Sequence, residues 1–489
     1  TATGVTEFTA TIESTKTSID ASDGKVTWTA GDEITVTDAA SKSAVYVAAS
    51  SETPTTFTLK TGQTAVGSGP YTATYGDITK QVYDANGANC PLSAKTTDAS
   101  TKSLRFSSPY AVLKITAKSS NSDVIKTVVV TYGDNGSFLD CGDGVTLTNE
   151  GVDFYVAIEP ANAAELSVAF YNTADKMAKK TRTESISLAA KILLPVTFDL
   201  SDWGTPIFKA VLDASNNLTF YYDTQDYSGD GITIYQNGTS NYLLDQSKSN
   251  NQIWGYYSKS TNITGVVIDP SVAGYKGLTS TAYMFYNMTN ASRISGAEHL
   301  DVSGVTNMVG MFFNFGSAST TLKDVPKVSG WNTGLVTNMS SMFQSYGSKN
   351  VSFNAVPDVS KWDTRNVTNM NSMFKSFASI STELECAPKV NGTNWNTVEV
   401  TDMSGMFRDY GKASEKLKEA PDVSSWNTQK VTKMGDLFYG YGHNSGNLKA
   451  APEVDNWDTG NVTSVTNLFW DYGNGSASFN LDLSKWDLS

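Results

Sequence analysis

The sequence predicts a multidomain protein in which two all-β sandwich domains precede an α/β solenoid. A phrase with a period of about 31 residues fills the C-terminal half, and short alternating strands fill the first 200 residues. We expect residues 1–107 and 108–204 to form the sandwiches, 205–298 a cap segment, and 299–489 the solenoid.

The repeat is clearest in DVSKWDTRNVTNMNSMFKSF, residues 358–377. An aligned Phe recurs in steps of 27, 31, 31, 33, 31 and 31 residues from a degenerate first copy at Phe285, giving Phe312, Phe343, Phe374, Phe407, Phe438 and Phe469. A Trp lies 12 residues earlier in five copies, at Trp331, Trp362, Trp395, Trp426 and Trp457. Repeats of this length bury their apolar faces by stacking, so we expect these Trp and Phe residues in the core.

The apolar positions within a copy predict a helix. They follow the spacing i, i+3, i+6, i+7 and i+10, as in Val367, Met370, Met373, Phe374 and Phe377. On a helix these positions form one stripe, which indicates a short amphipathic helix. Upstream, a Pro precedes an alternating run such as residues 359–362, which indicates a short strand. Each coil is therefore expected to contain a strand, a turn, a helix and a loop.

This pattern resembles the leucine-rich repeats of the BspA-like bacterial surface protein family, whose phrase reads Leu-Asp-Leu-Ser-x-Trp-Asp-Thr-x-x-Val-Thr-x-Met-x-x-Met-Phe. The similarity runs from about Phe208 to the end and includes the segments Lys209–Asp223 and Gly265–Tyr275 as a lead-in. The resemblance implies a leucine-rich-repeat-like solenoid and a role in adhesion at the bacterial surface.

The N-terminal region predicts β-sandwiches, because short strands are separated by Gly, Asn, Asp and Pro turns. The expected strands are residues 7–12, 34–37, 57–59, 113–116, 127–131, 154–158 and 167–171. The stretch Thr15–Val36, with Trp28, Gly31, Asp32 and Ile34, and the stretch Pro109–Lys118 are similar to fimbrillin-like proteins.

That second resemblance implies a two-domain β-sandwich subunit or anchor of a fimbria, delivered to the outer membrane as a lipoprotein. Polymerising members are cut after an Arg, and the first Arg of this chain is Arg105, beyond any N-terminal strand. A long repeat block also occupies the C-terminal end. These departures favour an anchored or tip subunit over a shaft subunit.

Composition limits the classes of partner. The net charge of −13 argues against nucleic acid, since phosphate binding needs a basic face. No apolar run is long enough for a transmembrane segment. The low charged fraction of 17% and the abundance of Thr, Ser, Asn, Gly and Tyr indicate an extracellular β-rich protein.

The sequence offers little for catalysis or for cofactor and metal binding. The histidines His299 and His443 lie in different repeats and away from any cysteine. A calcium loop at Asp223, Asp226 and Asp230 lacks EF-hand spacing, so a plain hairpin turn is the stronger interpretation. The three cysteines are Cys90, Cys141 and Cys386. The sequence leaves two alternatives, a Cys90–Cys141 disulfide or free thiols. We therefore expect a non-catalytic protein without a cofactor.

A ridge of loops is the predicted binding surface. Five residues of drifting identity follow the aromatic-Gly step in each coil, with inert solvated loops as the alternative. The candidate ligand-binding residues are Lys349, Asn350, Lys412, Glu415, Lys416, His443, Asn444, Asn447 and Asn474.

The predicted function is adhesion at the cell surface, to a protein or glycan of host or bacterial cells. Two alternatives stay open: a structural or tip subunit of a fimbria, whose partners are other fimbrial subunits, and a glycan-binding surface lipoprotein. The predicted location is the outer membrane, with a lipid anchor, or a fimbria.

Overall fold

The computed structural model divides the chain into two compact units, Thr1–Pro206 and Ile207–Ser489. It describes residues 5–12, 30–31, 33–40, 42–51, 55–75, 81–84, 87–88, 92–96, 103–106, 109–133, 135–188, 193–237, 239, 242–244, 254–476 and 483–487.

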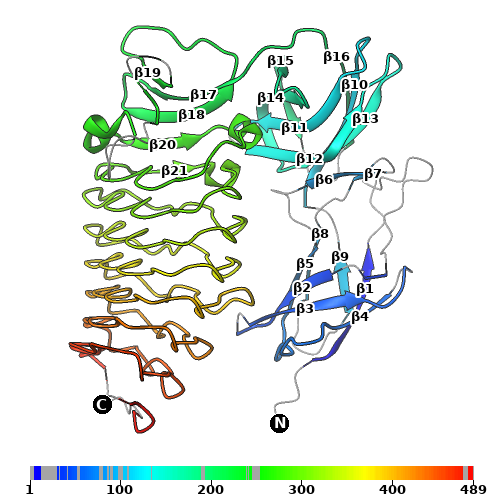
Figure 1. Cartoon of the computed structure of the whole chain (residues 1–489). Helices are drawn as coiled ribbons and strands as arrows, with labels where there is room; N and C mark the ends of the chain where they lie inside the picture. The colour runs from blue at the N-terminus through cyan, green and yellow to red at the C-terminus, as the bar shows by residue number, and fades with distance from the viewer. Residues whose placement is uncertain are drawn as a thin grey trace. The chain divides into compact units, whose positions relative to one another are not determined.

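A seven-stranded sheet begins the first unit (Figure 1). In the order β8-β5-β2-β3-β4-β1-β9 it contains β1 (Glu7–Ile12), β2 (Glu33–Thr37), β3 (Ser43–Ala48), β4 (Thr55–Leu59), β5 (Thr72–Tyr75), β8 (Leu92–Lys95) and β9 (Ser103–Phe106). Alternate residues of β2 and β3 are buried, as expected for strands with one face on a core. Phe8 packs edge-on against Tyr46 and Tyr71 at the centre of that core.

Two further sheets enclose a second core in the same unit. A three-stranded sheet in the order β13-β10-β16 contains β10 (Ala111–Lys118), β13 (Val152–Ile158) and β16 (Leu193–Asp199). A six-stranded sheet in the order β15-β14-β11-β12-β6-β7 contains β6 (Gln81–Asp84), β7 (Gly87–Ala88), β11 (Val124–Tyr132), β12 (Asn135–Thr146), β14 (Ala161–Asn172) and β15 (Met177–Leu188). Buried residues of both sheets, such as Ile115 and Val128, form one core.

All seven strands expected in this region lie within observed strands. Period-two alternation is a local signal of a half-buried strand, and β2 has that burial pattern. Two short strands from the first 107 residues, β6 and β7, extend the six-stranded sheet. Gln81 fixes β6 there, with Nε2 donating to the Ala157 carbonyl (2.9 Å) and Oε1 accepting from the Ala157 N–H (2.7 Å). Most of the fimbrillin-like stretch, Trp28 and Asp32 included, lies outside the described residues.

A five-stranded sheet caps the repeats. Its order is β19-β17-β18-β20-β21, and it contains β17 (Ile207–Leu212), β18 (Asn217–Asp223), β19 (Thr233–Gln236), β20 (Gly265–Ile268) and β21 (Ile294–Ser295). Three short 3-10 helices accompany it, η2 (Tyr257–Asn262), η3 (Pro270–Gly274) and η4 (Ala297–His299). Trp254 Nε1 donates to the Ala282 carbonyl (2.8 Å) and Tyr256 Oη to the Met284 carbonyl (2.7 Å). The cap thereby satisfies carbonyls of the first coil that no earlier coil could reach.

The repeats form a stack of coils joined by backbone hydrogen bonds (Figure 1). Successive coils pair in parallel at Ser280, Asn307, Asn338, Asn369, Asp402, Lys433 and Ser464. Around the aligned residues from Phe285 to Phe438, alternate N–H groups donate to the next coil, as from Phe343 to the Met373 carbonyl (2.8 Å). The N–H groups between them donate within the coil, as from Gln344 to the Ser341 carbonyl (3.2 Å).

The predicted α/β solenoid is therefore wrong, since the described residues of these coils contain turns and parallel bridges but no α-helix. The residues two before and two after every aligned Phe have φ between 53° and 62°. This left-handed conformation interrupts a right-handed helix, so each segment is a chain of short turns. Thirteen of these fourteen positions hold Gly, Ser, Asn or Asp, and the exception is Tyr283.

The expected strand at residues 359–362 is also wrong. The segment is a turn closed by the Trp362 N–H, which donates to the Val359 carbonyl (3.1 Å). The predicted apolar stripe is nevertheless fully buried, because turns of four residues place the same positions inward as a helix would. Its members are Val367, Met370, Met373, Phe374 and Phe377.

Candidate functional site

The five-residue loops after the aromatic-Gly step are stacked in register. The Ala413 N–H donates to the Ser379 carbonyl (2.9 Å), and the Asn444 N–H donates to the Lys412 carbonyl (3.0 Å). The left-handed residue that precedes each loop also donates to the previous coil, as from Gly411 to Phe377 (3.0 Å). Backbone bonds thus fix each loop on its neighbour, and the row of loops is a preformed surface, called here the loop ridge (residues 317–321, 348–352, 379–383, 412–416, 443–447 and 474–476).

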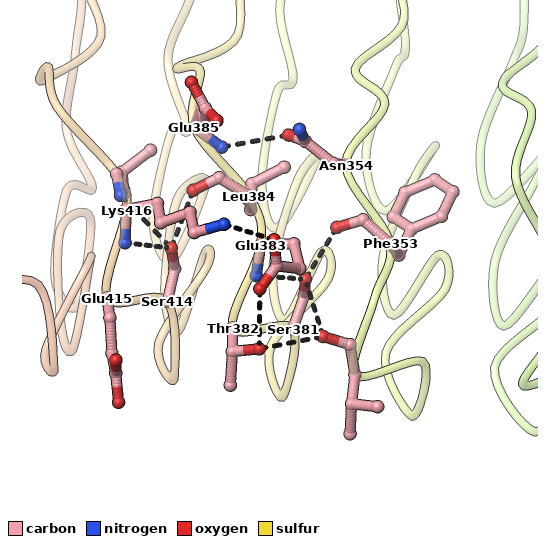
Figure 2. Close-up of polar contacts among 12 residues, drawn as sticks. Phe353, Asn354, Ser381, Thr382, Glu383, Leu384, Glu385, Ser414, Glu415 and Lys416 are labelled. Carbon is pink, nitrogen blue, oxygen red and sulfur yellow. Dashed lines mark hydrogen bonds and ion pairs between the residues drawn. The ribbon is translucent and has the colours of Figure 1, made fainter.

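The third residue of the first five loops is a buried anchor. These residues are Ser319, Asn350, Ser381, Ser414 and Ser445, and Ser476 at the same position of the last loop is half-buried. Ser381 Oγ donates to the Phe353 carbonyl (2.6 Å), and Ser414 Oγ donates to the Leu384 carbonyl (2.6 Å), as Figure 2 shows. Each hydroxyl also accepts from the N–H two residues later, which for Ser414 is that of Lys416 (3.1 Å). The anchor therefore satisfies polar groups of two coils at once.

The predicted drift of residue identity in these loops does not hold at this position. The signal was present in the sequence, since five of the six loops carry Ser there and the sixth carries Asn. Asn350, predicted as a ligand-binding residue, is buried, and its Nδ2 donates to the Leu322 carbonyl (2.7 Å). It belongs to the anchors and has no accessible side chain.

The other predicted ridge residues differ in exposure. Lys412 and His443 are half-buried. The exposed members are Lys349, Glu415, Lys416, Asn444, Asn447 and Asn474. Sequence reasoning missed two large aliphatic side chains of the same ridge, Val351 (57% exposed) and Ile380 (42% exposed). Apolar residues in otherwise polar loops were the available signal.

Two lysines of the ridge form ion pairs, one between coils and one within a coil. Lys416 Nζ lies 2.5 Å from Glu383 Oε2, an interaction visible in Figure 2, and this hydrogen bond raises the pKa of Lys416. Lys412 Nζ lies 2.8 Å from Asp409 Oδ1, which likewise raises the pKa of Lys412. The positive charges of these two lysines are therefore balanced by carboxylates. These lysines would do little to attract a strongly charged ligand by long-range electrostatics.

The Trp and Phe columns lie in the core. The five Trp residues are 0–6% exposed, and among the aligned Phe residues only Phe469 is partly buried. Trp362 Nε1 donates to the Val328 carbonyl of the previous coil (2.8 Å), and Trp331 stacks on Trp362 with ring centroids 6.1 Å apart. Buried rings cannot present faces to a glycan, so these columns hold the coils together.

The calcium-loop residue Asp223 and the cysteines were the other candidates from the sequence. Asp223 is buried, with Oδ1 3.0 Å from Lys209 Nζ, and its Oδ2 accepts a hydrogen bond from Tyr227 Oη (2.7 Å). Within the described part of the chain, no group of three or more His, Cys, Asp or Glu residues is placed to hold a metal ion. Cys141 is a buried free thiol whose pKa is raised by burial to about 12, and Cys386 is an exposed one. Cys90 lies outside the described residues.

The repeats match a known family model. Residues 279–419 and 384–489 match the family described as "Mycoplasma protein of unknown function, DUF285". The leucine-rich-repeat assignment is thereby overturned, because the matching family is a different one and the coils lack the expected helices. This match does not extend to the N-terminal region, so it gives the fimbrillin-like module no support.

Two solved structures resemble part of this chain. A proposed cell adhesion protein from Bacteroides uniformis is 16% identical, with 40% of this chain and 93% of that chain covered and a TM-score of 0.25. A proposed cell adhesion protein from Bacteroides ovatus is 14% identical, with 45% and 98% covered and a TM-score of 0.24. These TM-scores are too low to establish a shared fold. The curated proteins contain no match to this chain. None of the described helices is long and apolar enough to cross a membrane.

Proposed function

We propose that this chain is a non-catalytic adhesion protein of the cell surface, which binds a macromolecule of a host or bacterial cell through the loop ridge. The observation that carries the proposal is the contrast between anchor and surface in each loop. In the first five loops the third residue is buried and hydrogen-bonded in a repeated way, whereas the residues on either side of it, apart from Ala413, are exposed and differ from coil to coil. Such a surface can change its binding residues without changing its backbone.

The exposed aliphatic residues favour a protein as the ligand of the ridge. The Thr382 N–H donates to the Val351 carbonyl (2.9 Å), so the loops that carry Val351 and Ile380 are neighbours. Burying two such side chains against a partner would remove apolar area from water, which drives most protein association. A glycan would gain less from aliphatic contacts than from ring faces.

Binding of the full chain tests this proposal. Immobilised fibronectin, fibrinogen, laminin and collagen serve as protein probes, and whole bacterial cells and a glycan array serve as the others. A surface variant combines Lys349→Ser, Val351→Ser, Ile380→Ser, Glu415→Ser and Asn444→Ser and keeps every buried anchor.

A matched control is Leu335→Ser, because Leu335 is an aliphatic residue outside the loops with 54% exposure. We expect the surface variant to lose at least tenfold in affinity for the protein or cell that the wild type binds, and the control to bind as the wild type does. Equal binding by wild type and surface variant would remove the ridge from the proposal. If the folded wild type binds none of the probes, the result would favour a structural subunit whose partners are fimbrial proteins.

A further inference from the structure

An aromatic patch lies on the outer side of the first coils. We define the patch as Tyr257, Tyr283, Tyr286 and Phe313, all of which are half-buried. Tyr286 stacks on Phe313 with ring centroids 5.2 Å apart, and Tyr257 lies 6.2 Å from Tyr286. The Tyr283 ring is 5.5 Å from that of Tyr286 and stands at 82° to it. None of these four rings belongs to the buried core of the coils.

Tyr283 occupies a position that disfavours a large side chain. Its φ is 57°, a conformation in which a bulky residue is an outlier. The equivalent residues of the later coils are Gly310, Ser341, Ser372, Gly405, Asp436 and Asn467. A Cβ atom added at Gly310 would lie 2.6 Å from Tyr283 Cε1, so the next coil leaves space for this ring. Strain retained at a surface side chain is a signal of function more often than of stability.

Uncharged polar side chains lie beside the patch. Asn287 and Asn314, each directly after a patch residue, are half-exposed and joined by a hydrogen bond from Asn314 Nδ2 to Asn287 Oδ1 (3.2 Å). The parallel-bridge residues of these coils are Ser280 and Asn307. The equivalent positions of later coils carry ion pairs. Arg408, at the position of Tyr286, lies with Nη1 2.6 Å from Oδ2 of Asp436, which is at the position of Tyr283. The patch therefore offers ring surface and amides without a fixed charge.

We infer that the aromatic patch, with the Asn287 and Asn314 amides, binds a neutral glycan. Ring surfaces suit the C–H faces of a sugar, and the two amides can each donate to and accept from hydroxyl groups. The four rings and the two amides carry no charge, so a cationic or anionic ligand would find no partner for its charge among them. The site is separate from the loop ridge and does not depend on it.

The test uses the labelled full chain on a glycan array that carries neutral, sialylated and sulfated oligosaccharides. The decisive variant is Tyr283→Asn, because Asn adopts positive φ readily and stands at the same position as Asn467. We expect Tyr283→Asn to lower retention on neutral glycans at least tenfold while leaving the thermal unfolding midpoint unchanged or higher. Tyr286→Ala gives a second variant in which retention should fall as strongly.

Trp470→Ala is the matched control. Trp470 is 61% exposed and occupies in the last coil the position that Tyr286 occupies in the first, one residue after the aligned Phe. Retention equal to wild type in this control, with loss in the two patch variants, supports the site. The inference is overturned by wild-type retention on charged glycans alone, by no retention on any glycan, or by neutral-glycan retention that Tyr283→Asn and Tyr286→Ala leave intact. The loop-ridge surface variant should keep its glycan retention, which separates this result from the outcome for the ridge.

Discussion

Trp426 stacks on Trp457 with ring centroids 6.1 Å apart and planes within 1° of parallel. The same relationship joins Trp331 to Trp362, but Trp395 between these pairs stands apart. The coil of Trp395 is two residues longer than its neighbours, with 33 residues between successive aligned Phe residues. The Trp395 backbone N–H donates to the Gly392 carbonyl (2.9 Å), whereas the Trp362 backbone N–H donates to the Val359 carbonyl. The two additional residues before Trp395 displace the turn. Among the described residues, the Trp395 Nε1 atom is consequently left without an acceptor.

This difference predicts unequal costs for one substitution at two tryptophans. Trp362→Phe removes the bond from Nε1 to the Val328 carbonyl, whereas Trp395→Phe removes a buried donor that has no partner. We expect Trp362→Phe to destabilise the chain by about 1 kcal/mol more than Trp395→Phe does. Urea unfolding followed by circular dichroism measures both. Equal shifts would mean that the Trp395 indole is as well bonded as its counterparts.

The turn path of the coils predicts a sharp preference at Ser376, whose φ is 55°. Ser376→Val should cost about 1–2 kcal/mol, because a side chain with a branched Cβ opposes the left-handed conformation. Ser376→Asn should change the free energy of unfolding by less than about 0.5 kcal/mol. Thermal unfolding of the two variants checks the contrast. A helix at this segment would instead tolerate Val and Asn about equally.

Substitution of a buried anchor of the loop ridge should destabilise the chain, whereas substitution of the exposed residue beside it should not. Ser414→Ala removes the bond to the Leu384 carbonyl and leaves the Lys416 N–H without its acceptor, which should cost about 1–3 kcal/mol. Glu415→Ala alters the exposed neighbour and should stay within about 0.5 kcal/mol of wild type. Urea midpoints provide the measurement. A neutral Ser414→Ala would show that the anchors do not hold the loops.

His299 predicts a loss of stability on mild acidification. The imidazole is 8% exposed, and burial lowers its pKa below the ordinary value of 6.5, against the opposing effects of Glu298 and Asp269. The unfolded chain then binds the proton more readily than the folded chain. Stability is fully present above pH 6.5 and falls as the pH drops from there toward the folded pKa.

The measurement compares urea midpoints at about pH 7.5 and about pH 5.5, a range that spans the ordinary titration of histidine. His299→Asn, which does not titrate, should show a smaller difference between the two midpoints than wild type does. An equal pH dependence in the variant would assign the effect to other groups.

Local features of this protein can be predicted from its amino-acid sequence. Period-two alternation marked strands such as 34–37 and 113–116, because each face of these strands meets a different environment. The repeat phrase also identified the buried positions, since Val367 and Phe374 are inward on any backbone that turns about every four residues.

The path of the backbone between those positions was decided only by the tertiary structure. A helix and a chain of left-handed turns bury the same residues, and they differ in where alternate N–H groups donate. In the coils those groups reach carbonyls of the next repeat, about 30 residues away in sequence, as from Ser345 to Lys375. The buried anchors, the exposed pair Val351 and Ile380, and the aromatic patch around Tyr283 arise from the same stacking. Residues distant in the chain become neighbours only when one coil packs on another, and no local pattern encodes that contact.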